Sequence, residues 1–281
     1  MAIPYLQGYL VKPATFDLLG RVTFTDGTNA VTPNQQQCEA YGYAYNSADG
    51  TCTAYDFSMN LGSSIRNETN KLQGAGNSTE TGTNNTCIIG ENNLVKGISR
   101  NNIIVGSNNE IANSINNANV YGTLGEATAT NSIVLGGNAG GDNLAERQNI
   151  TLMYGWQTTD NSTVDAYLNN TLNSYFVVPI NTAIYFQSET LAVRIGGVNE
   201  SGNKGDFKSW VERGVVINKN GTLSIDRSRT SPADSGTTSG WSPINSVSGT
   251  NFLQTIKGAN DMIIEWASTI RLTQIKTGVT L

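Results

Sequence analysis

The sequence contains no histidine among its 281 residues. Histidine is the usual proton carrier of Ser-His and Cys-His catalytic sites and the commonest zinc ligand, so its absence excludes those arrangements. Charged residues are also scarce, at 14%, where an average soluble protein has about 25%. The net charge is −5 and Lys and Arg form no cluster, so the chain lacks the basic surface that nucleic acid requires. We therefore expect no nucleic-acid partner.

Long apolar segments are missing as well. No stretch approaches the roughly 18 apolar residues of a membrane-spanning helix, so we expect no membrane insertion. The N-terminal segment MAIPYLQGYLVKPATFDLLG lacks both the basic start and the uninterrupted apolar run of a secretory signal. We therefore expect a protein that is made and folded in a cytoplasm.

The three cysteines are too few for a disulfide framework, and none has the CxxC spacing of zinc or redox sites. We interpret Cys87 as a buried small hydrophobe. Cys38 and Cys52 enclose only the short segment 39–51 and can be neighbours in space. They are either two reduced structural thiols or, after release into an oxidising medium, a disulfide. We expect no metal site and no cofactor.

Turn-forming residues make up much of what is present. Asn occurs 35 times and Gly 30 times, and together with Thr and Ser they favour turns over long helices. A coiled coil and a helical bundle are therefore excluded. At roughly 100 to 200 residues per domain, the length predicts two domains or one domain with appendages. We expect a mixed module over residues 1–66, a repeat region over 67–147 and a C-terminal domain over 148–281.

The N-terminal module carries the strongest helix signal. We expect a short helix over residues 33–41, with Thr32 as its N-cap, Pro33 at its first position and Gly42 after its end. A hairpin with its turn at residues 46–50 should follow. The tyrosines of this module form its core, a subunit contact or a sugar-binding surface. They are Tyr41, Tyr43, Tyr45 and Tyr55.

A repeat with a period of about 14 to 16 residues organises the middle of the chain, and such internal periodicity is the signature of repeat architectures. Gly74, Gly90, Gly106 and Gly122 are equally spaced at the longer period, and Gly136 follows at the shorter one. Each unit combines a short, mostly β-branched strand, an Asn-rich turn and a weaker second strand. A fixed period with this chemistry predicts a β-solenoid with one coil per repeat. The position two before each glycine is apolar: Leu72, Ile88, Ile104, Val120 and Val134.

The repeat chemistry also predicts how the coils turn and associate. Glycine is expected where φ is positive or where two backbones pass closely, and Asn tolerates the left-handed conformation and can form ladders between coils. So short a coil should not bury its whole apolar stripe alone, so we expect a homotrimer. The expected trimer core consists of Ile88, Ile104, Val120 and Val134, with Gly90 and Gly106 at the turns.

Longer strands are expected in the C-terminal domain, and between residues 262 and 272 apolar and polar side chains alternate as in a half-buried strand. Loops rich in Gly, Ser, Asn and Asp are expected over 197–205 and 228–240. Such strands and loops predict an antiparallel β-sandwich or jelly roll, and the whole chain is expected to be all-β. The expected strands are 150–155, 174–178, 183–195, 207–217, 222–226 and 261–274.

Two segments resemble known families. NIIVGSNNEIANSINN and NSIVLGGNAGG resemble the head repeats of trimeric autotransporter adhesins, which implies a trimeric left-handed parallel β-roll over about a quarter of the chain. GNKGDFKSWVERGVVINKNGTLSI and the later DMIIEWASTIRLTQI resemble the C-terminal β-domain of tailed-bacteriophage fibre proteins, in which a G-D-x-x-x-W/Y-x-x-x-G run and a late E-W-x-x-x-x-R strand recur. This second resemblance covers roughly residues 183–281 and implies a virion appendage. An autotransporter adhesin would need a secretion signal, a stalk and a membrane anchor, which favours the phage alternative.

These resemblances imply a trimeric tail fibre or spike of a phage particle. The N-terminal module would attach to portal, tail or capsid proteins, and the C-terminal loops would recognise a host-surface glycan or protein. A head fibre or capsid decoration protein without an essential receptor role is the alternative. The expected receptor contacts are Asn199, Asn203, Asp206, Arg229, Asp234 and Trp241.

Glycan cleavage needs a pair of carboxylates. In the repeat region, Glu91, Glu110 and Glu126 occur one per coil, which is typical of solvated turns. The GGNAGGDN segment at residues 136–143 has the form of one calcium-binding repeat unit, and we expect it to be a turn between domains. We therefore expect that the chain is not an enzyme. The C-terminal candidates for a carboxylate pair are Asp206, Glu212, Asp226, Asp234 and Glu265.

Overall fold

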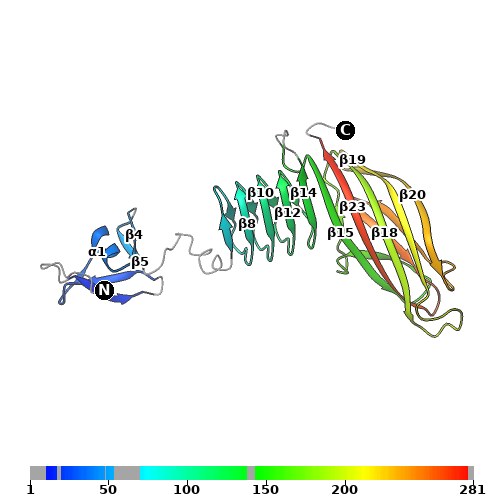
Figure 1. Cartoon of the computed structure of the whole chain (residues 1–281), viewed down its shortest axis with the longest axis horizontal. Helices are drawn as coiled ribbons and strands as arrows, with labels where there is room; N and C mark the ends of the chain where they lie inside the picture. The colour runs from blue at the N-terminus through cyan, green and yellow to red at the C-terminus, as the bar shows by residue number, and fades with distance from the viewer. Residues whose placement is uncertain (1–10, 18–19, 48, 54–69, 138–142, 278–281) are drawn as a thin grey trace. The chain divides into compact units, whose positions relative to one another are not determined.

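The computed structural model describes residues 11–17, 20–47, 49–53, 70–137 and 143–277. The chain divides into two compact units, residues 1–65 and residues 66–281. Nearly all of the regular structure is β-strand, as Figure 1 shows, which confirms the all-β fold class. Within the described ranges, no helix has the length and apolar character needed to cross a membrane.

The N-terminal unit contains two small antiparallel sheets and a short helix. Strands β1 (Lys12–Phe16), β2 (Val22–Thr25) and β3 (Ala30–Val31) form the first sheet. Helix α1 (Gln35–Ala40) follows. Strands β4 (Ala44–Asn46) and β5 (Thr51–Thr53) then pair as the hairpin that the sequence predicts.

The start of α1 differs from the expectation. Its N-cap is Asn34 and not Thr32. The Asn34 side chain accepts a hydrogen bond from the backbone N–H of Gln37 at 2.8 Å, and the Gln37 side chain accepts one from the N–H of Asn34 at 3.0 Å. This reciprocal capping box satisfies two backbone donors at once, and it places the helix start two residues after the expected cap.

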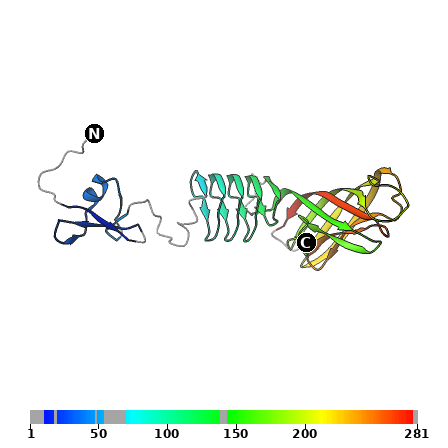
Figure 2. The ribbon, with the colours of Figure 1, turned by 90° about the horizontal axis from the view of Figure 1, so that it is seen from below.

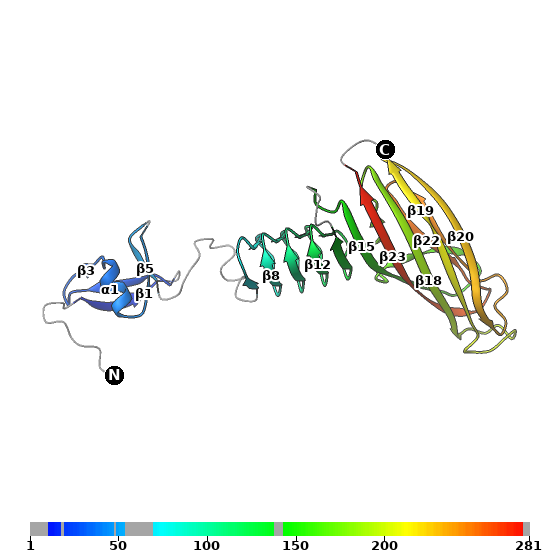
Figure 3. The ribbon, with the colours of Figure 1, turned by 45° about the horizontal axis from the view of Figure 1, so that its top comes forward.

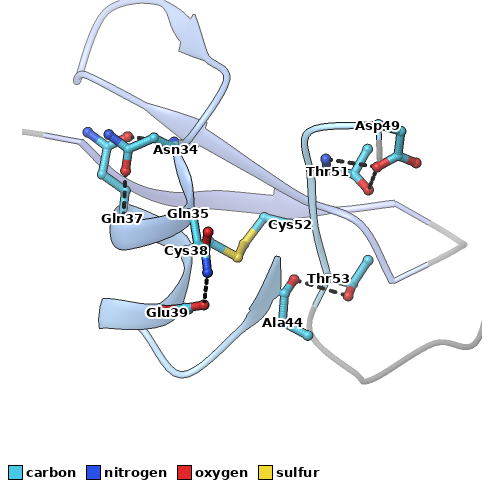
Figure 4. Close-up of a disulfide and its surroundings, with 10 residues drawn as sticks. All are labelled: Asn34, Gln35, Gln37, Cys38, Glu39, Ala44, Asp49, Thr51, Cys52 and Thr53. Carbon is cyan, nitrogen blue, oxygen red and sulfur yellow. Dashed lines mark hydrogen bonds between the residues drawn. A yellow bond between two sulfur atoms is a disulfide. The ribbon is translucent and has the colours of Figure 1, made fainter. Parts of the chain in front are cut away.

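A disulfide joins Cys38 of α1 to Cys52 of β5 (Figure 4). Both cysteines are buried with Val22 and Phe24 in the small core of this unit. Because so few apolar side chains form that core, the covalent link supplies stability that packing alone gives only weakly in a small module.

The tyrosines of this unit pack on its core. The rings of Tyr41 and Tyr43 contact Phe24 edge-on, with centroids 5.8 Å and 6.3 Å away, and Tyr45 packs against the same cluster. Of the alternatives left open by the sequence, this packing favours a core role for Tyr43 and Tyr45, whereas Tyr41 is 46% exposed. Tyr55 lies outside the described residues.

Residues 70–137 form the β-solenoid that the repeat predicts (Figure 2). Each coil contributes one strand to a long parallel sheet and one short strand to a second parallel sheet. The second sheet consists of β7 (Ser78–Thr79), β9 (Leu94–Val95), β11 (Glu110–Ile111) and β13 (Glu126–Ala127). The first consists of β6 (Lys71–Gln73), β8 (Cys87–Glu91), β10 (Ile103–Ser107), β12 (Asn119–Thr123) and β14 (Ile133–Gly137). The left-handed sense of the roll stays a prediction.

The repeat glycines stand directly above one another. Gly90 and Gly106 are register partners, and Gly106 pairs in turn with Gly122. A Cβ on Gly90 would overlap the carbonyl oxygen of Gly106, and Gly106 has φ +141°. Both reasons given for glycine in the sequence, positive φ and close backbone approach, are therefore confirmed at these positions.

A buried asparagine ladder links the coils. The Asn93 amide donates to the side-chain oxygen of Asn77 at 2.9 Å, and the Asn109 amide donates to that of Asn93 at 3.1 Å. The same amides also donate to the carbonyl oxygens of Gly106 and Gly122. The predicted ladder is confirmed, and it satisfies backbone groups that the tight glycine turns would otherwise leave unpaired.

The structure corrects the expectation that the coil cannot bury its own apolar stripe. Ile88, Ile104, Val120 and Val134 are at most 1% exposed in a single chain, because the opposite short strands cover them. Their partners in this core include Val95 and Ile111 of the second sheet. These side chains therefore need no second chain to be buried, and a trimer contact must use other residues.

The C-terminal part is a two-layer antiparallel sandwich (Figure 3). One layer has the strand order β20, β19, β18, β23, β15 and continues through β14 into the solenoid sheet. In the other layer, β22 pairs with β16, β17 and β21. The strands of the first layer are β15 (Arg147–Thr158), β18 (Thr182–Gly196), β19 (Phe207–Lys219), β20 (Thr222–Ser235) and β23 (Ile263–Lys276). Those of the second are β16 (Thr163–Leu168), β17 (Phe176–Val177), β21 (Ser242–Ser248) and β22 (Asn251–Lys257).

The antiparallel strands are confirmed, with two differences in their extent. The segment 228–240 was expected to be a loop, yet β20 continues to Ser235 because its backbone pairs with β19 along almost its whole length. Strands β16, β21 and β22 were not expected, since their short alternating patterns carry many Ser, Thr and Asn side chains. The GGNAGGDN segment lies largely outside the described residues.

Candidate functional site

The far end of the sandwich carries a cluster of loops, which we call the loop end and define as residues 197–206, 236–241 and 258–262. These segments join β18 to β19, β20 to β21 and β22 to β23. Asn199 connects two of them, because its N–H donates to the carbonyl of Asp261 at 3.1 Å and its side chain donates to that of Asn260 at 2.8 Å. The loop end is thus one connected surface.

Arg194 lies beneath the first loop, residues 197–206, and holds it in place. Its side chain is buried, and its guanidinium donates to the carbonyl oxygens of Gly196 at 3.1 Å, Ser201 at 2.7 Å and Asn199 at 2.6 Å. Hydrogen bonds from a charged donor are among the stronger ones in proteins. The loop is therefore fixed in shape by a side chain that lies beneath it.

Asp206 ties the first loop to the second. Its carboxylate accepts from the N–H of Asn203 at 2.8 Å and from the N–H of Thr237 at 3.1 Å. The side chain is buried, and a Cβ on Gly236 would overlap the carboxylate, so the second loop passes directly over it. Asp206, expected as a receptor contact, is placed as an internal support of the loops.

Trp241 is also buried and faces inward. Its ring lies 6.4 Å from that of Trp266, which stacks on Trp210 at 5.5 Å. This tryptophan group fills the sandwich beneath the loop end. Trp241, like Asp206, is therefore positioned to support the surface rather than to face a receptor.

The remaining expected contacts are nearer to solvent. Asp234 is exposed and pairs with Lys208 at 2.9 Å, and hydrogen bonds from Thr238 and Lys208 hold the pKa of its carboxyl below the usual value. Arg229 donates to the hydroxyl of Ser242 at 2.9 Å and to the carbonyl of Pro243, which lie beyond the loop on β21. Asn203 is exposed at the loop end.

The structure adds an aromatic group that the sequence analysis missed. Trp156 and Tyr167 contact edge-on with centroids 4.7 Å apart, and Tyr175 follows at 5.7 Å from Tyr167. The Tyr175 hydroxyl donates to Asp165 at 2.8 Å, and all four side chains are partly exposed. Rings beside a carboxylate suit a sugar, which offers C–H faces to aromatics and hydroxyls to an acceptor. Spacing along the chain gave no signal of this group, because antiparallel pairing of β15 with β16 creates it.

The solenoid also brings two carboxylates together. Glu110 and Glu126 are register partners on β11 and β13, so about 4.8 Å separates their backbones. Glu110 forms an ion pair with Lys96 at 2.5 Å. Burial raises the pKa of Glu126, and the neighbouring Glu110 raises it further. The expectation of solvated turn residues is wrong for this pair, since both side chains are partly buried on paired strands.

The acids expected in the C-terminal domain do not form such a pair. Asp206 supports the loop end, whereas Glu212 is buried between the layers with Arg227 at 3.3 Å and Asn245 at 3.0 Å. Burial raises the pKa of Glu212. Within the described residues, no group of three or more Cys, Asp or Glu side chains could hold a metal ion.

The chain resembles known proteins in its fold and not in its sequence. No protein-family model matches the sequence, and no curated protein sequence matches it. Among solved structures, the chain is similar to the tailspike protein of Acinetobacter baumannii phage AM24, with a TM-score of 0.28 and 8% identity over 74% of this chain and 56% of that one. It is also similar to the tailspike protein gp49 of A. baumannii bacteriophage Fri1, with a TM-score of 0.27 and 9% identity over 75% of this chain and 48% of that one.

A third similar structure is the tailspike protein of Acinetobacter phage vB_ApiP_P1, with a TM-score of 0.25 and 12% identity over 73% of this chain and 46% of that one. The chain thus spans about half the length of these tailspikes.

One comparison corrects the sequence analysis. The Fri1 tailspike is described as a capsular polysaccharide depolymerase. The expectation that the present chain is not an enzyme is contradicted by that finding, and we withdraw it.

Proposed function

We propose that the chain is a subunit of a bacteriophage tail appendage, built as a homotrimer, that recognises the host surface through its loop end. The N-terminal unit attaches it to other proteins of the virion. The observation that carries this proposal is the loop end itself, where two buried charged side chains, Arg194 and Asp206, fix loops whose tips stay in solvent.

Fixed loops with exposed tips suit recognition. Ordering a flexible loop on binding costs free energy, so a surface that is already held in one shape binds more tightly for the same contacts. Val198 is 85% exposed at the tip of the first loop, and an apolar side chain in that position has no packing role in the chain. The resemblance of residues 183–281 to phage fibre domains supports the same role.

The first test is binding to host cells. Replacing Val198 with Glu and Asn203 with Ala should lower binding of the purified protein by about tenfold or more, since central contacts of an interface carry most of its energy. The melting temperature should not change, because both side chains are outside the core. Binding is measured by fluorescence on the bacterium that the phage infects.

Leu172→Glu is the matched control for this test. Leu172 is 61% exposed, and its turn lies at the solenoid side of the sandwich, where Asn169 donates to the carbonyl of Thr130. Equal loss of binding from the control, or full binding by the loop variant, would contradict recognition through the loop end. Imaging of the protein on the capsid rather than on the tail would contradict the tail assignment and favour a head fibre.

We propose glycan cleavage as a second function, because Glu110 and Glu126 are register partners on adjacent strands and interact electrostatically. Retaining glycosidases hold two carboxyl groups about 5 Å apart, one protonated as the acid and one ionised as the nucleophile. The raised pKa of Glu126 suits the acid, and Glu110, which forms an ion pair with Lys96, would be the nucleophile. Glu110 would bond to the anomeric carbon as the leaving sugar departs with the proton of Glu126, and water, giving a proton back to Glu126, would then cleave that bond and free Glu110.

The cleavage test measures new reducing ends released from host capsule. Glu126→Gln and Glu110→Gln should each lower the rate by about a hundredfold or more, since each removes one of the two required groups. Glu91→Gln is the control, because Glu91 is an exposed acid of the same solenoid. No release by the unaltered protein would exclude this function and leave the binding proposal intact.

A further inference from the structure

The outer face of the long solenoid sheet carries a row of apolar side chains. Ile89, Val105, Tyr121 and Leu135 are successive register partners on β8, β10, β12 and β14. They are 41%, 37%, 39% and 49% exposed. Since the inner face of the same strands already fills the coil, these side chains have no role in the core of their own chain.

A second row runs beside the first. It consists of Cys87, Ile103, Asn119 and Ile133, again in register, with Ile103 39% and Ile133 45% exposed. We call the two rows together the ladder face. None of the described residues that form it carries a charge.

The ladder face ends where the sandwich begins. The first row continues across β15 and β23 as Asn149 and Thr273, which hydrogen-bond to each other at 2.9 Å. The second row continues as Thr151 and Arg271, and Arg271 pairs with Glu189 at 3.5 Å. The two rows are thus interrupted by polar and charged side chains at β15 and β23, and the first row becomes apolar again only at Tyr185 on β18.

The size and regularity of the ladder face indicate an interaction surface. Four strands about 4.8 Å apart and about five residues long, at about 3.3 Å per residue, cover on the order of 300 Å². The largest apolar patch on a typical monomer covers about 300 to 600 Å² and is often functional, and the ladder face reaches that size.

A copy of the same chain is the occupant that this surface suits. The apolar side chains of the ladder face recur once per coil. A second copy, related by rotation about an axis parallel to the solenoid, presents the same side chains at the same heights. Each ladder residue then meets its own counterpart. A charged residue would meet a like charge there, which is unfavourable, and the ladder face contains none.

We propose that the ladder face is the surface through which copies of this chain associate around the axis of the solenoid. The inference rests on the proposed homotrimer and identifies its contact. The trimer contact expected from the sequence was Ile88, Ile104, Val120 and Val134, which are buried within one chain. The contact inferred from the structure is made by their outward-facing neighbours.

The test combines solution mass with the reactivity of Cys87. Cys38 and Cys52 are joined, so Cys87 is the one free thiol of the three cysteines, and it lies in the ladder face. The unaltered protein should have three times the chain mass of 30.0 kDa by light scattering. The double variant Val105→Lys, Tyr121→Lys should be a monomer, and its Cys87 should react with maleimide about tenfold faster or more, because a covered thiol reacts only in the dissociated fraction.

Val198→Lys is the matched control, since it adds a charge at an exposed apolar site outside the ladder face, and it should stay trimeric with slow Cys87 labelling. Circular dichroism verifies that each variant is folded. A monomeric unaltered protein would overturn both the trimer and this inference. A trimer that survives the double substitution would overturn the ladder face alone.

Should the double variant fail to fold, the unaltered trimer still decides the question. Cys87 labelling in the native trimer as fast as in urea would overturn the inference, and labelling slowed about tenfold or more supports it, because its own chain leaves this thiol partly exposed.

Discussion

Replacing Gly106 with valine should unfold the solenoid at temperatures where the unaltered protein is folded. The new Cβ would overlap the carbonyl oxygen of Gly122, and valine would have to adopt φ +141°. Neither atom group can move aside, because both belong to backbones held in register. The expected loss in free energy of unfolding is about 3 kcal/mol or more per chain, which thermal denaturation followed by circular dichroism can measure.

Gly137→Val is the control for that substitution. Gly137 ends β14, and a Cβ there would meet no atom within 4 Å. Its effect on the melting temperature should be small. Equal losses of stability at both glycines would mean that valine is poorly tolerated at strand ends in general. The close approach of Gly106 to Gly122 would then not be the cause of the loss.

Asn109→Ala should be strongly damaging among the asparagines of the repeat turns. Asn109 is buried and makes three hydrogen bonds, donating to Asn93 and to the carbonyl of Gly122 and accepting from the N–H of Gly125. Alanine leaves these buried groups unpaired at roughly 1 to 3 kcal/mol each. We expect a loss of about 3 kcal/mol or more in the free energy of unfolding, measured by urea denaturation.

Its neighbour Asn108 provides the contrast. Asn108 is less buried and has φ +55°, so Asn108→Ala loses only the tolerance of asparagine for that backbone conformation. We expect a loss of about 1 kcal/mol, as for other residues placed in left-handed turns. If the two substitutions cost the same, the ladder does not hold the coils together.

Much of the solenoid could be predicted because its determinants are local and repeated. The spacing of Gly90, Gly106 and Gly122 and the apolar residue two positions earlier identified both the coil length and the strands. The burial of Ile88 and Ile104 within a single chain was not predicted, since apolar residues also stand at Ile89 and Val105. Two adjacent apolar positions on a strand point to opposite faces, and only the opposing short strands decide which face is covered.

The candidate sites were predicted less well, because they depend on contacts between distant segments. Asp206 and Trp241 are in the expected loops or at their ends, but they are buried by Gly236 and Trp266, which arrive from other parts of the chain. The pairing of Glu110 with Glu126 follows from coil stacking, and the contact of Trp156 with Tyr167 follows from a hairpin. Amino-acid composition and residue spacing do not predict which distant residues come into contact.

The sequence by itself determined the all-β class, the period of the coils and the positions of the tight glycine turns, because each depends on backbone preferences of a few neighbouring residues. The tertiary structure decided which side chains are covered: Ile104 rather than Val105, Asn109 rather than Asn108, and Asp206 beneath its loop. Burial is a property of what packs on a segment, and that partner comes from another coil or strand. The ladder face and the loop end became visible only once that packing was known.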